Sequence, residues 1–578
     1  MKNTIKKRGQ KFLRKFSRAS VKAGAESKEH IRENLVKRIS HIASVRLLIV
    51  EWGLLVGALI LFAITQAFWF SGSYAVDVFS EGGAYTEATL GSVGSLNPLF
   101  ATTNSEKVLS KLMFATLSTV DYSGHSGIGL AESIRPSENG KVWTVKLREG
   151  LKWSDGAPIT VDDVIFTTEL IQNPLTNTIY NSNLARVKIE KNDENEIVFT
   201  LPSSYADFMT ALNFPIVPKH VLENTEPQNL IESSFSTAPI TSGAFSFNAV
   251  QTSGASDEKV FYLSANPNYY KGQPLLNSFA VHTYDTKEEI IRAINSGSVT
   301  ATAELSGKET EQIKNGSFIA KNSSLNYGAF AFFNTNSDIV KKAELRTAIR
   351  QGINLEKIRA AAPDTLPLDY PLLKNQIKLS KYPELPERDL EAAKAKIKEA
   401  FPESRPVISL ATVNSGYLPQ VSEVLKEELE SLGFEVNLAS YEESQDFISN
   451  IIAKRSYDIL VYDIELGTDP DLLPYFHSSQ ANSTGLNLSN YRNPMVDDLI
   501  LGARDALDED LRVKKYEALL DYWISSAPAI GLYQPNLTYY YNKNVRTFGN
   551  NVRLVTAIDR FSDINSWAAT KSTKNKTP

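Results

Sequence analysis

A short acidic segment in the last quarter of the chain holds residues that could do binding chemistry. The segment YDIELGTDPDLLPYF at 462–476 places several carboxylates around Gly467 and Pro470. Grouped carboxylates could hold a ligand amine through charge-assisted hydrogen bonds, or they could form a solvated turn. The candidate ligand-binding residues are Asp463, Glu465, Gly467, Asp469 and Asp471, together with Asn334, where the buried strand expected in YGAFAFFNTN at 327–336 ends.

Catalytic chemistry finds little support in the sequence. The nearest approach to a nucleophile elbow, GHSGI at 124–128, lacks the second glycine and lies in an expected loop. The six histidines show no metal-ligand spacing, and no Gly-rich phosphate loop with a lysine occurs. We therefore predict no catalytic residues, no metal, no cofactor and no enzymatic activity.

The most regular local pattern runs from 141 to 171. Val142, Thr144 and Lys146 alternate with Trp143, Val145 and Leu147, which predicts a half-buried strand over 142–148 that ends at a turn at Glu149-Gly150. Ser154-Asp155-Gly156 and Pro158 then favour a second turn. Thr160 as N-cap and Asp163 as third helical residue predict a helix directly afterwards. From its residue type alone, we interpret Trp153 as a residue that anchors the hydrophobic core.

The segment LREGLKWSDGAPITVDDVIFT at 147–167 resembles the signature of the extracellular solute-binding proteins of family 5, which serve peptide and nickel ABC importers. We interpret the signature residues Trp153, Asp155, Gly156, Thr160 and Asp163 as structural rather than ligand-binding. The resemblance runs nearly continuously from about residue 82 to 548.

The resemblance implies an α/β, two-lobed, periplasmic-binding-protein-like fold of type II, with an extra subdomain inserted in the first lobe. The expected boundaries are lobe one at 82–283 with the inserted subdomain at about 110–217, lobe two at 284–527, a return to lobe one at 528–567 and a disordered tail at 568–578. The chain crossings are expected near 284 and 527. The strands and helices expected from Pro406 to Tyr462 alternate, which independently indicates a parallel sheet covered by helices.

The resemblance also implies an acidic residue that holds the α-amino group of a bound peptide. Counting back four residues from Pro470 places that position at Leu466, so the expected carboxylate is missing in register. Glu465 is one residue away, and Asp463, Asp469 and Asp471 surround this position. Either Glu465 or Asp469 pairs with the amine, or the natural ligand has no free amine there.

The amino-terminal part differs sharply in charge from the rest of the chain. Residues 1–50 hold 14 Lys and Arg side chains against Glu26, Glu29 and Glu33, whereas the whole chain carries −5. Trp52 to Phe70 is uncharged, and its 19 residues approach the roughly 20 that span a bilayer. The positive-inside rule then places residues 1–50 in the cytoplasm, a transmembrane helix at 51–71 and the remainder outside. A cleaved signal peptide ending at Ala75 is the alternative.

The chain contains no cysteine, so disulfides and a lipidated cysteine tether are both excluded. We predict a membrane-anchored, single-pass, extracytoplasmic solute-binding component of an ABC importer that captures peptides by lobe closure. Its predicted partners are a peptide or other small solute, the permease and ATPase subunits and membrane lipid, with no nucleic acid. The alternatives are a binder of an oligosaccharide or metal chelate, or a tethered ligand sensor.

Overall fold

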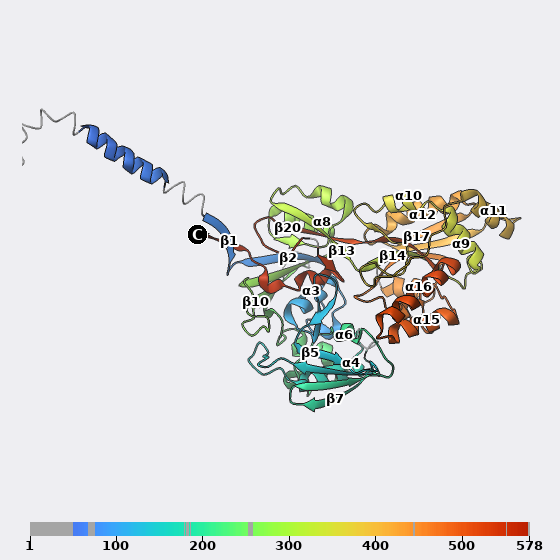
Figure 1. Cartoon of the computed structure of the whole chain (residues 1–578), viewed down its shortest axis with the longest axis horizontal. Coiled ribbons are helices and arrows are strands. Elements are labelled where there is room, and N and C mark those ends of the chain that lie inside the picture. The colour runs from blue at the N-terminus through green and yellow to red at the C-terminus, as the bar shows by residue number, and fades with distance from the viewer. Residues whose placement is uncertain are drawn as a thin grey trace, which may run out of the picture. The chain divides into compact units, whose positions relative to one another are not determined.

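The computed structural model describes residues 50–66, 75–178, 180, 184, 186–252, 258–442, 445–550 and 552–575. Two compact units result, one of residues 1–78 and 571–578 and one of residues 79–570. The larger unit contains two lobes with separate hydrophobic cores (Figure 1). We call residues 79–325 and 536–570 lobe one, and residues 327–534 lobe two.

Lobe one is built on an eight-stranded mixed sheet of order β21-β13-β20-β12-β2-β11-β10-β9. The side chains of β2 alternate between the two sheet faces. Tyr85 packs in the main lobe-one core with helix α3, whereas Ala88 packs with helix α8 on the other face. The strands are β2 (Ala84–Leu90), β9 (Phe245–Thr252), β10 (Lys259–Ala265), β11 (Ser278–Tyr284), β12 (Ala301–Thr302), β13 (Phe318–Leu325), β20 (Asn536–Asn542) and β21 (Arg553–Leu554).

Helices α3 and α8 both begin with a capping box. Thr103 caps α3 (Asn104–Met113) and Thr286 caps α8 (Lys287–Ser296), each with a glutamate at the third helical position. The other helices of lobe one are short: α6 (Phe208–Ala211), α7 (Lys219–Leu222), η2 (Pro98–Phe100), η3 (Pro227–Glu232), η4 (Ser234–Ser236), η5 (Gly307–Gln312), η8 (Ala557–Phe561) and η9 (Ile564–Ser566).

A separate four-stranded antiparallel sheet of order β5-β6-β8-β7 lies within the range expected for the inserted subdomain. Its strands are β5 (Ala131–Pro136), β6 (Val142–Leu147), β7 (Lys188–Asp193) and β8 (Glu196–Thr200). Helix α4 (Val161–Gln172) follows the signature loop, and a small hairpin of β3 (Ser118–Val120) and β4 (Ser126–Ile128) precedes the sheet.

The signature segment forms the predicted strand, turn and helix. Trp153 is fully buried and its backbone N–H donates to the Ala157 carbonyl at 2.8 Å. Gly156 has φ +92°, a left-handed conformation that glycine adopts without strain. Thr160 caps α4, and its backbone N–H donates to Asp163 Oδ2 at 2.8 Å. This segment holds the fold together around a buried indole.

Lobe two is built on a six-stranded sheet of order β15-β19-β14-β18-β16-β17. Parallel pairing of β16 with β17 and β18 agrees with the alternation of strands and helices in the sequence. The strands are β14 (Tyr327–Phe333), β15 (Leu366–Pro367), β16 (Val407–Val413), β17 (Glu435–Tyr441), β18 (Ile459–Glu465) and β19 (Ala529–Gln534). The helices are α9 (Ala343–Gly352), α10 (Leu355–Ala360), α11 (Leu390–Ala400), α12 (Leu418–Ser431), α13 (Gln445–Phe447), η6 (Ile448–Ile452), α14 (Leu473–Phe476), η7 (Ser478–Gln480), α15 (Pro494–Asp505) and α16 (Glu509–Ser526).

The two chain crossings differ from the predicted positions near 284 and 527. Strand β13 still pairs in the lobe-one sheet and β14 in the lobe-two sheet, so the first crossing is at Asn326. The return lies at Pro535, between β19 and β20. The prediction failed because α8 and β12 alternate like lobe-two elements, although β12 pairs with β2 and β20 of lobe one.

The structure at the two ends of the described chain differs in part from the predictions. The expected tail at 568–578 was predicted to be disordered, yet Thr570–Asn575 form β22, which pairs with β1 (Ala75–Ser80). A helix covers residues 50–66, while residues 1–49 and 67–71 of the predicted basic and membrane segments lie outside the described residues. Among the described helices none is both long and apolar enough for a bilayer crossing.

Candidate ligand-binding cleft

The carboxyl end of β18 lies beside the first chain crossing, where the two lobes meet. Strand β16 pairs with β18 only through Ile459, Leu460 and Val461. Along Tyr462–Glu465 the strand pairing found among the described residues is with β14. Where a strand extends past one of its neighbours, the backbone of an extended ligand can pair with it.

Glu465 is the acidic residue of this region that remains open to solvent. The hydroxyl of Tyr327 donates to its carboxylate at 3.1 Å, and the hydroxyl of Tyr475 donates to its backbone carbonyl at 2.7 Å. Although solvent reaches the side chain, the protein crowded around it removes much of its hydration and raises the pKa of the Glu465 carboxyl. Asp559 of lobe one raises that pKa further, and Lys107 of α3 lowers it. Groups from both lobes therefore surround this carboxylate.

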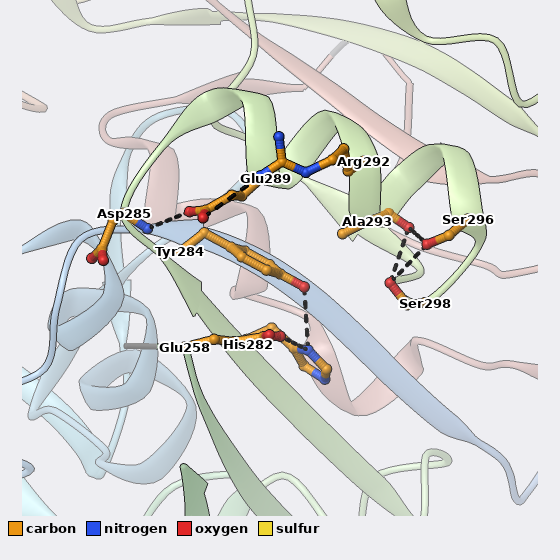
Figure 2. A pocket seen from close by; sticks show the side chains of 9 residues that line it. All are labelled: Glu258, His282, Tyr284, Asp285, Glu289, Arg292, Ala293, Ser296 and Ser298. Carbon is orange, nitrogen blue, oxygen red and sulfur yellow. Dashed lines mark hydrogen bonds and ion pairs between the residues drawn. The ribbon is translucent and has the colours of Figure 1, made fainter. Parts of the chain in front are cut away.

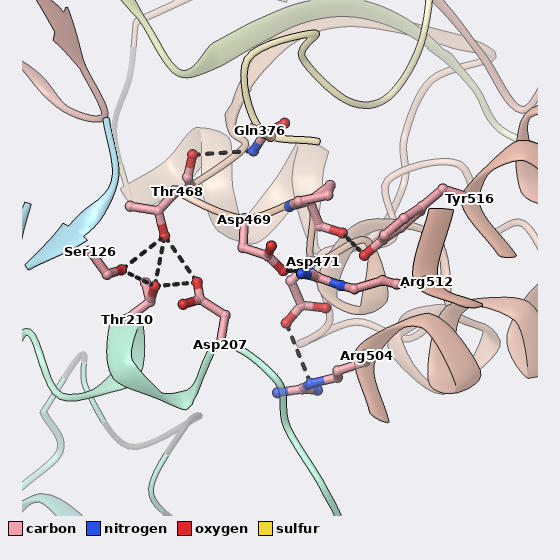
Figure 3. Close-up of polar contacts among 12 residues, drawn as sticks. Ser126, Asp207, Thr210, Gln376, Thr468, Asp469, Asp471, Arg504, Arg512 and Tyr516 are labelled. Atoms are coloured by element: carbon pink, nitrogen blue, oxygen red, sulfur yellow. Dashed lines mark hydrogen bonds and ion pairs between the residues drawn. The ribbon is translucent and has the colours of Figure 1, made fainter. Parts of the chain in front are cut away.

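Asp469 and Asp471 are neutralised within lobe two. Asp469 is paired with Arg512 of α16, and Asp471 is paired with Arg504 of α15 at 3.6 Å (Figure 3). Asp471 also accepts a hydrogen bond from the backbone N–H of Leu473 at 3.1 Å. These two carboxylates therefore hold the loop against α15 and α16.

Leu466 and Gly467 fix the loop to the crossing point. Leu466 is buried, and its backbone N–H donates to the Asn326 carbonyl at 2.7 Å. Gly467 has φ +73°, and its carbonyl accepts from Asn326 Nδ2 at 2.8 Å and from Gln376 Nε2 at 3.2 Å. The leucine thus points into packed protein, and the loop geometry depends on the glycine.

Asn334 lies at the other end of the sheet from the acidic loop. Tyr327 is opposite Glu465 and Phe333 is opposite Ile459, so the whole length of β14 separates Asn334 from Glu465. The Asn334 amide donates to the carbonyls of Arg455 at 3.2 Å and Tyr457 at 3.0 Å. Its buried amide joins the loops at this end of the sheet, and the structure does not bring it together with Glu465.

Asp463 lines a cavity of about 600 Å³ to which both lobes contribute. Lobe one provides residues of η5, β13 and β20, and lobe two provides residues of β18, β19 and the start of α12. The cavity is thus adjacent to the return crossing at Pro535. A cavity in this position changes its walls whenever the lobes move relative to each other.

Direct polar contacts join the lobes next to the acidic loop (Figure 3). The hydroxyl of Thr468 in lobe two lies 2.6 Å from that of Thr210 and donates to Asp207 Oδ2 at 3.0 Å, both in lobe one. Ser126 lies 2.9 Å from Thr210 through their hydroxyls. Loss of hydration raises the pKa of the Asp207 carboxyl, and its hydrogen bonds from the threonines oppose that shift.

A second contact links the lobes at α15. The guanidinium carbon of Arg504 lies 4.2 Å from the centre of the Tyr205 ring, a cation–π arrangement. The backbone N–H of Ala206 donates to the Arg504 carbonyl at 3.0 Å, and Ser204 Oγ donates to the Asp505 carbonyl at 3.0 Å. Together with the Thr468 contacts, these interactions join the two lobes.

A different hollow, of about 530 Å³, lies entirely in lobe one (Figure 2). His282 Nδ1 lies 3.3 Å from Glu258 Oε1, and burial lowers the pKa of the His282 imidazole. The residues that line this hollow belong to β11, α8 and the segments beside them. Because no lobe-two residue of the described chain lines it, lobe closure does not act on this hollow directly. The described residues also contain no group of three metal-ligating side chains.

Several residues of this cleft carry no signal in the sequence. Asp207, Thr210 and Ser126 lie in unremarkable loop or hairpin segments, and tertiary structure alone brings them to Thr468. The predicted acidic loop does lie where the lobes meet, but no pattern in the sequence indicates which residues contact it. Only the placement of Thr468 between Gly467 and Asp469 could have drawn attention to it.

Two α/β lobes joined by two chain crossings, with a cavity and direct contacts between them, define a two-lobed solute-binding protein. The chain belongs to the bacterial extracellular solute-binding proteins, family 5 Middle, whose family model matches residues 128–485. Members of this family bind solutes for ABC transporters and catalyse no reaction, so the chain is a binding protein and not an enzyme.

Individual relatives agree with this assignment. The chain is 25% identical over 484 residues to the oligopeptide-binding protein AppA of Bacillus subtilis, covering 79% of this chain and 87% of AppA. Its fold matches the substrate-binding protein CtaP of Listeria monocytogenes with a TM-score of 0.74 at 23% identity, over 85% of this chain and 100% of CtaP. It also matches NikZ of Campylobacter jejuni, solved with Ni(L-His), with a TM-score of 0.70 at 19% identity, over 84% and 99%.

Proposed function

We propose that this chain is a membrane-anchored, extracytoplasmic solute-binding component of an ABC importer that captures peptides by closing its two lobes and delivers them to a permease. The observation that carries the proposal is the interlobe site itself. A solvent-accessible carboxylate, a strand end that extends past β16 and a cavity lie together where the lobes meet. The relative that matches along most of its length bears the name of an oligopeptide-binding protein.

The end of β18 that extends past β16 suits a peptide because backbone pairing binds any sequence in an extended form. Glu465 then offers a carboxylate to the amino end of that peptide. A free ammonium enclosed without a counter-charge would lose several kcal/mol of hydration, so a carboxylate at this place favours peptides with a free amino end. Asp469 does not fit this role because Arg512 already neutralises it.

The proposed membrane anchor rests on the sequence. The uncharged run from Trp52 to Phe70 follows a segment of net charge +11. Interaction of that basic segment with anionic lipid on the cytoplasmic face would reinforce the orientation. A tether keeps the binding protein close to its permease and ATPase partners, which raises their effective concentration.

Binding of defined solutes to the full-length protein in detergent tests the peptide proposal. We expect isothermal titration calorimetry to detect tri- to pentapeptides, and small-angle scattering to show a smaller radius of gyration when peptide is bound. Oligosaccharides and a nickel–histidine chelate serve as comparison solutes. If these bind and no peptide of the panel does, the peptide assignment is wrong and the solute class changes, while the family assignment stands.

A further inference from the structure

A further cavity, of about 370 Å³, lies beside both chain crossings, and we call it the hinge cavity. Lobe one contributes Ser324, which comes shortly before the crossing at Asn326. Lobe two contributes Gln534, which directly precedes the return at Pro535. The rest of the described lining comes from Arg553 of lobe one and from the segment 366–375 of lobe two. A group bound in the hinge cavity therefore contacts both lobes at the place where the chain connects them.

The hinge cavity is separate from the cavity beside Asp463. Tyr533 and Gln534 are neighbours on β19, so their side chains point to opposite faces of the lobe-two sheet. Tyr533 lines the cavity beside Asp463, whereas Gln534 and its strand partner Leu366 line the hinge cavity. A group in the hinge cavity can therefore bind together with a solute in the cavity beside Asp463.

Two positive side chains line the hinge cavity, one from each lobe. Arg553 belongs to β21 and Lys374 to the segment that follows β15. Neither forms an ion pair within the described part of the chain, and Lys374 Nζ lies 5.7 Å from the centre of the Tyr382 ring. Asp369, the carboxylate of the described lining, is already paired with Arg359 at 2.7 Å. The cavity therefore carries an excess of positive charge, which concave walls focus on a small volume.

Much of the remaining wall is apolar. Leu368, Leu372 and Leu373 line the cavity and belong to the lobe-two core. Leu366 lines it as well and is 49% exposed. Pockets with apolar walls and a few charged groups bind the apolar body of a ligand and orient its polar end. A guanidinium matches the two oxygens of a carboxylate, so these walls suit a carboxylate that is joined to an apolar group.

We propose that the hinge cavity binds a carboxylate that carries an apolar group, with Arg553 and Lys374 at the carboxylate and the leucines around the apolar group. The site does not depend on the main solute being a peptide. Because the two cations come from different lobes, a carboxylate held by both favours the arrangement of the lobes in this structure. Binding in the hinge cavity and solute binding between the lobes are then coupled, and the coupling acts equally in both directions.

Three small probes test the site by isothermal titration calorimetry. Phenylacetate carries the carboxylate and an apolar ring, phenylacetamide keeps the ring without the charge, and acetate keeps the charge without the ring. Titrations use the full-length protein in detergent, the variants Lys374→Gln and Arg553→Gln, and the charge-matched control Lys396→Gln. All three side chains are exposed, and Lys396 lies outside the hinge cavity.

We expect the parent protein to bind phenylacetate about tenfold more tightly than phenylacetamide or acetate, because the charged hydrogen bonds and the buried ring both contribute. Lys374→Gln and Arg553→Gln should each weaken phenylacetate binding about tenfold and leave phenylacetamide binding almost unchanged. Lys396→Gln should change neither. Unfolding temperatures equal to that of the parent show that the variants keep the fold.

A pair of peptides identifies the source of the carboxylate. Ala-Ala-Ala-Phe is compared with a free and with an amidated carboxyl end. If the parent prefers the free form and Lys374→Gln and Arg553→Gln lose that preference, the carboxylate belongs to the bound peptide. If both forms bind alike while phenylacetate binding depends on Lys374 and Arg553, the site takes a separate carboxylate. Saturating phenylacetate should then change the affinity of the parent for the peptide and leave that of the two variants unchanged.

The inference is overturned if the variants bind phenylacetate and the free-carboxyl peptide as the parent does, or if neither binds at all. Equal affinities for phenylacetate and acetate would overturn the assignment of an apolar group. A peptide affinity that saturating phenylacetate leaves unchanged would overturn the coupling between the lobes. The phenylacetate titrations require no peptide, so failure of the hinge site and failure of the proposed peptide function are observed separately.

Discussion

The hydroxyl of Thr468 provides a direct test of lobe closure. Thr468→Val keeps the shape of the side chain and removes the group that contacts Asp207 and Thr210. These partners belong to lobe one and Thr468 to lobe two, so we expect the contacts to form as the lobes close. The substitution should therefore shift the equilibrium between open and closed forms and leave the stability of each lobe almost unchanged.

The expected magnitude follows from the hydrogen bonds. A hydrogen bond to a charged group contributes about 1.5–3 kcal/mol. Asp207 keeps a second partner, the Thr210 hydroxyl, so we expect the low end of this range. About 1.5 kcal/mol corresponds to roughly a tenfold loss of affinity, because closure free energy adds to binding free energy.

Calorimetric titration of a peptide that binds the parent protein measures this effect, and small-angle scattering of the unliganded and liganded forms shows whether closure changes. Thr237→Val is the matched control, since Thr237 is exposed and its hydroxyl bonds only to the nearby Ser234 carbonyl at 3.0 Å. An affinity within twofold of the parent would refute the role of Thr468 in closure. A large drop in the unfolding temperature of the unliganded variant would show that the hydroxyl stabilises the fold instead.

Four further changes test other parts of the molecule. Trp153→Ala empties a fully buried site and should cost about 3–5 kcal/mol in urea unfolding, with or without peptide; unchanged unfolding with lost binding would make Trp153 a ligand contact. Arg560→Met leaves Glu87, its buried partner at 2.5 Å, without a counter-charge and should cost a similar 3–5 kcal/mol; a small effect would mean that Glu87 becomes protonated or hydrated. Affinity for a peptide with a free amino end should fall as the pH drops through the pKa of Glu465. Because that pKa is raised, the fall should occur at a higher pH than for an ordinary glutamate. Glu465→Gln or acetylation of the peptide should abolish this dependence. In the unliganded protein the sign is opposite, because the contribution of Glu465 to stability is present below its unfolded pKa and is lost as the pH rises through the folded pKa. Protease added to intact cells should degrade the outer part and leave a small amino-terminal fragment, whereas a mature chain beginning near Val76 would exclude the anchor.

Much of the local structure could be predicted because the responsible residues are close in sequence. The capping pair Thr160 and Asp163 and the alternation in Val142–Leu147 depend on neighbours within a few positions. The crossing at Asn326 could not be found in this way. Its position depends on which sheet β12 and β13 join, and that pairing is decided by β2 and β20, which lie far away in the sequence.

Counting acidic residues gave an incomplete view of the site because the count does not show which carboxylates are paired with arginines. The sequence offers four carboxylates between Asp463 and Asp471, yet arginines of α15 and α16 neutralise the two that follow Gly467. The two that precede it, Asp463 and Glu465, project from the end of β18 into the region between the lobes. The buried Leu466 and the turn at Gly467 separate the two pairs of carboxylates. The second pair fixes the loop that presents Thr468 to lobe one. Replacing an acid by leucine at 466 therefore need not remove recognition of a cation, because the strand before it still carries two carboxylates toward the cleft.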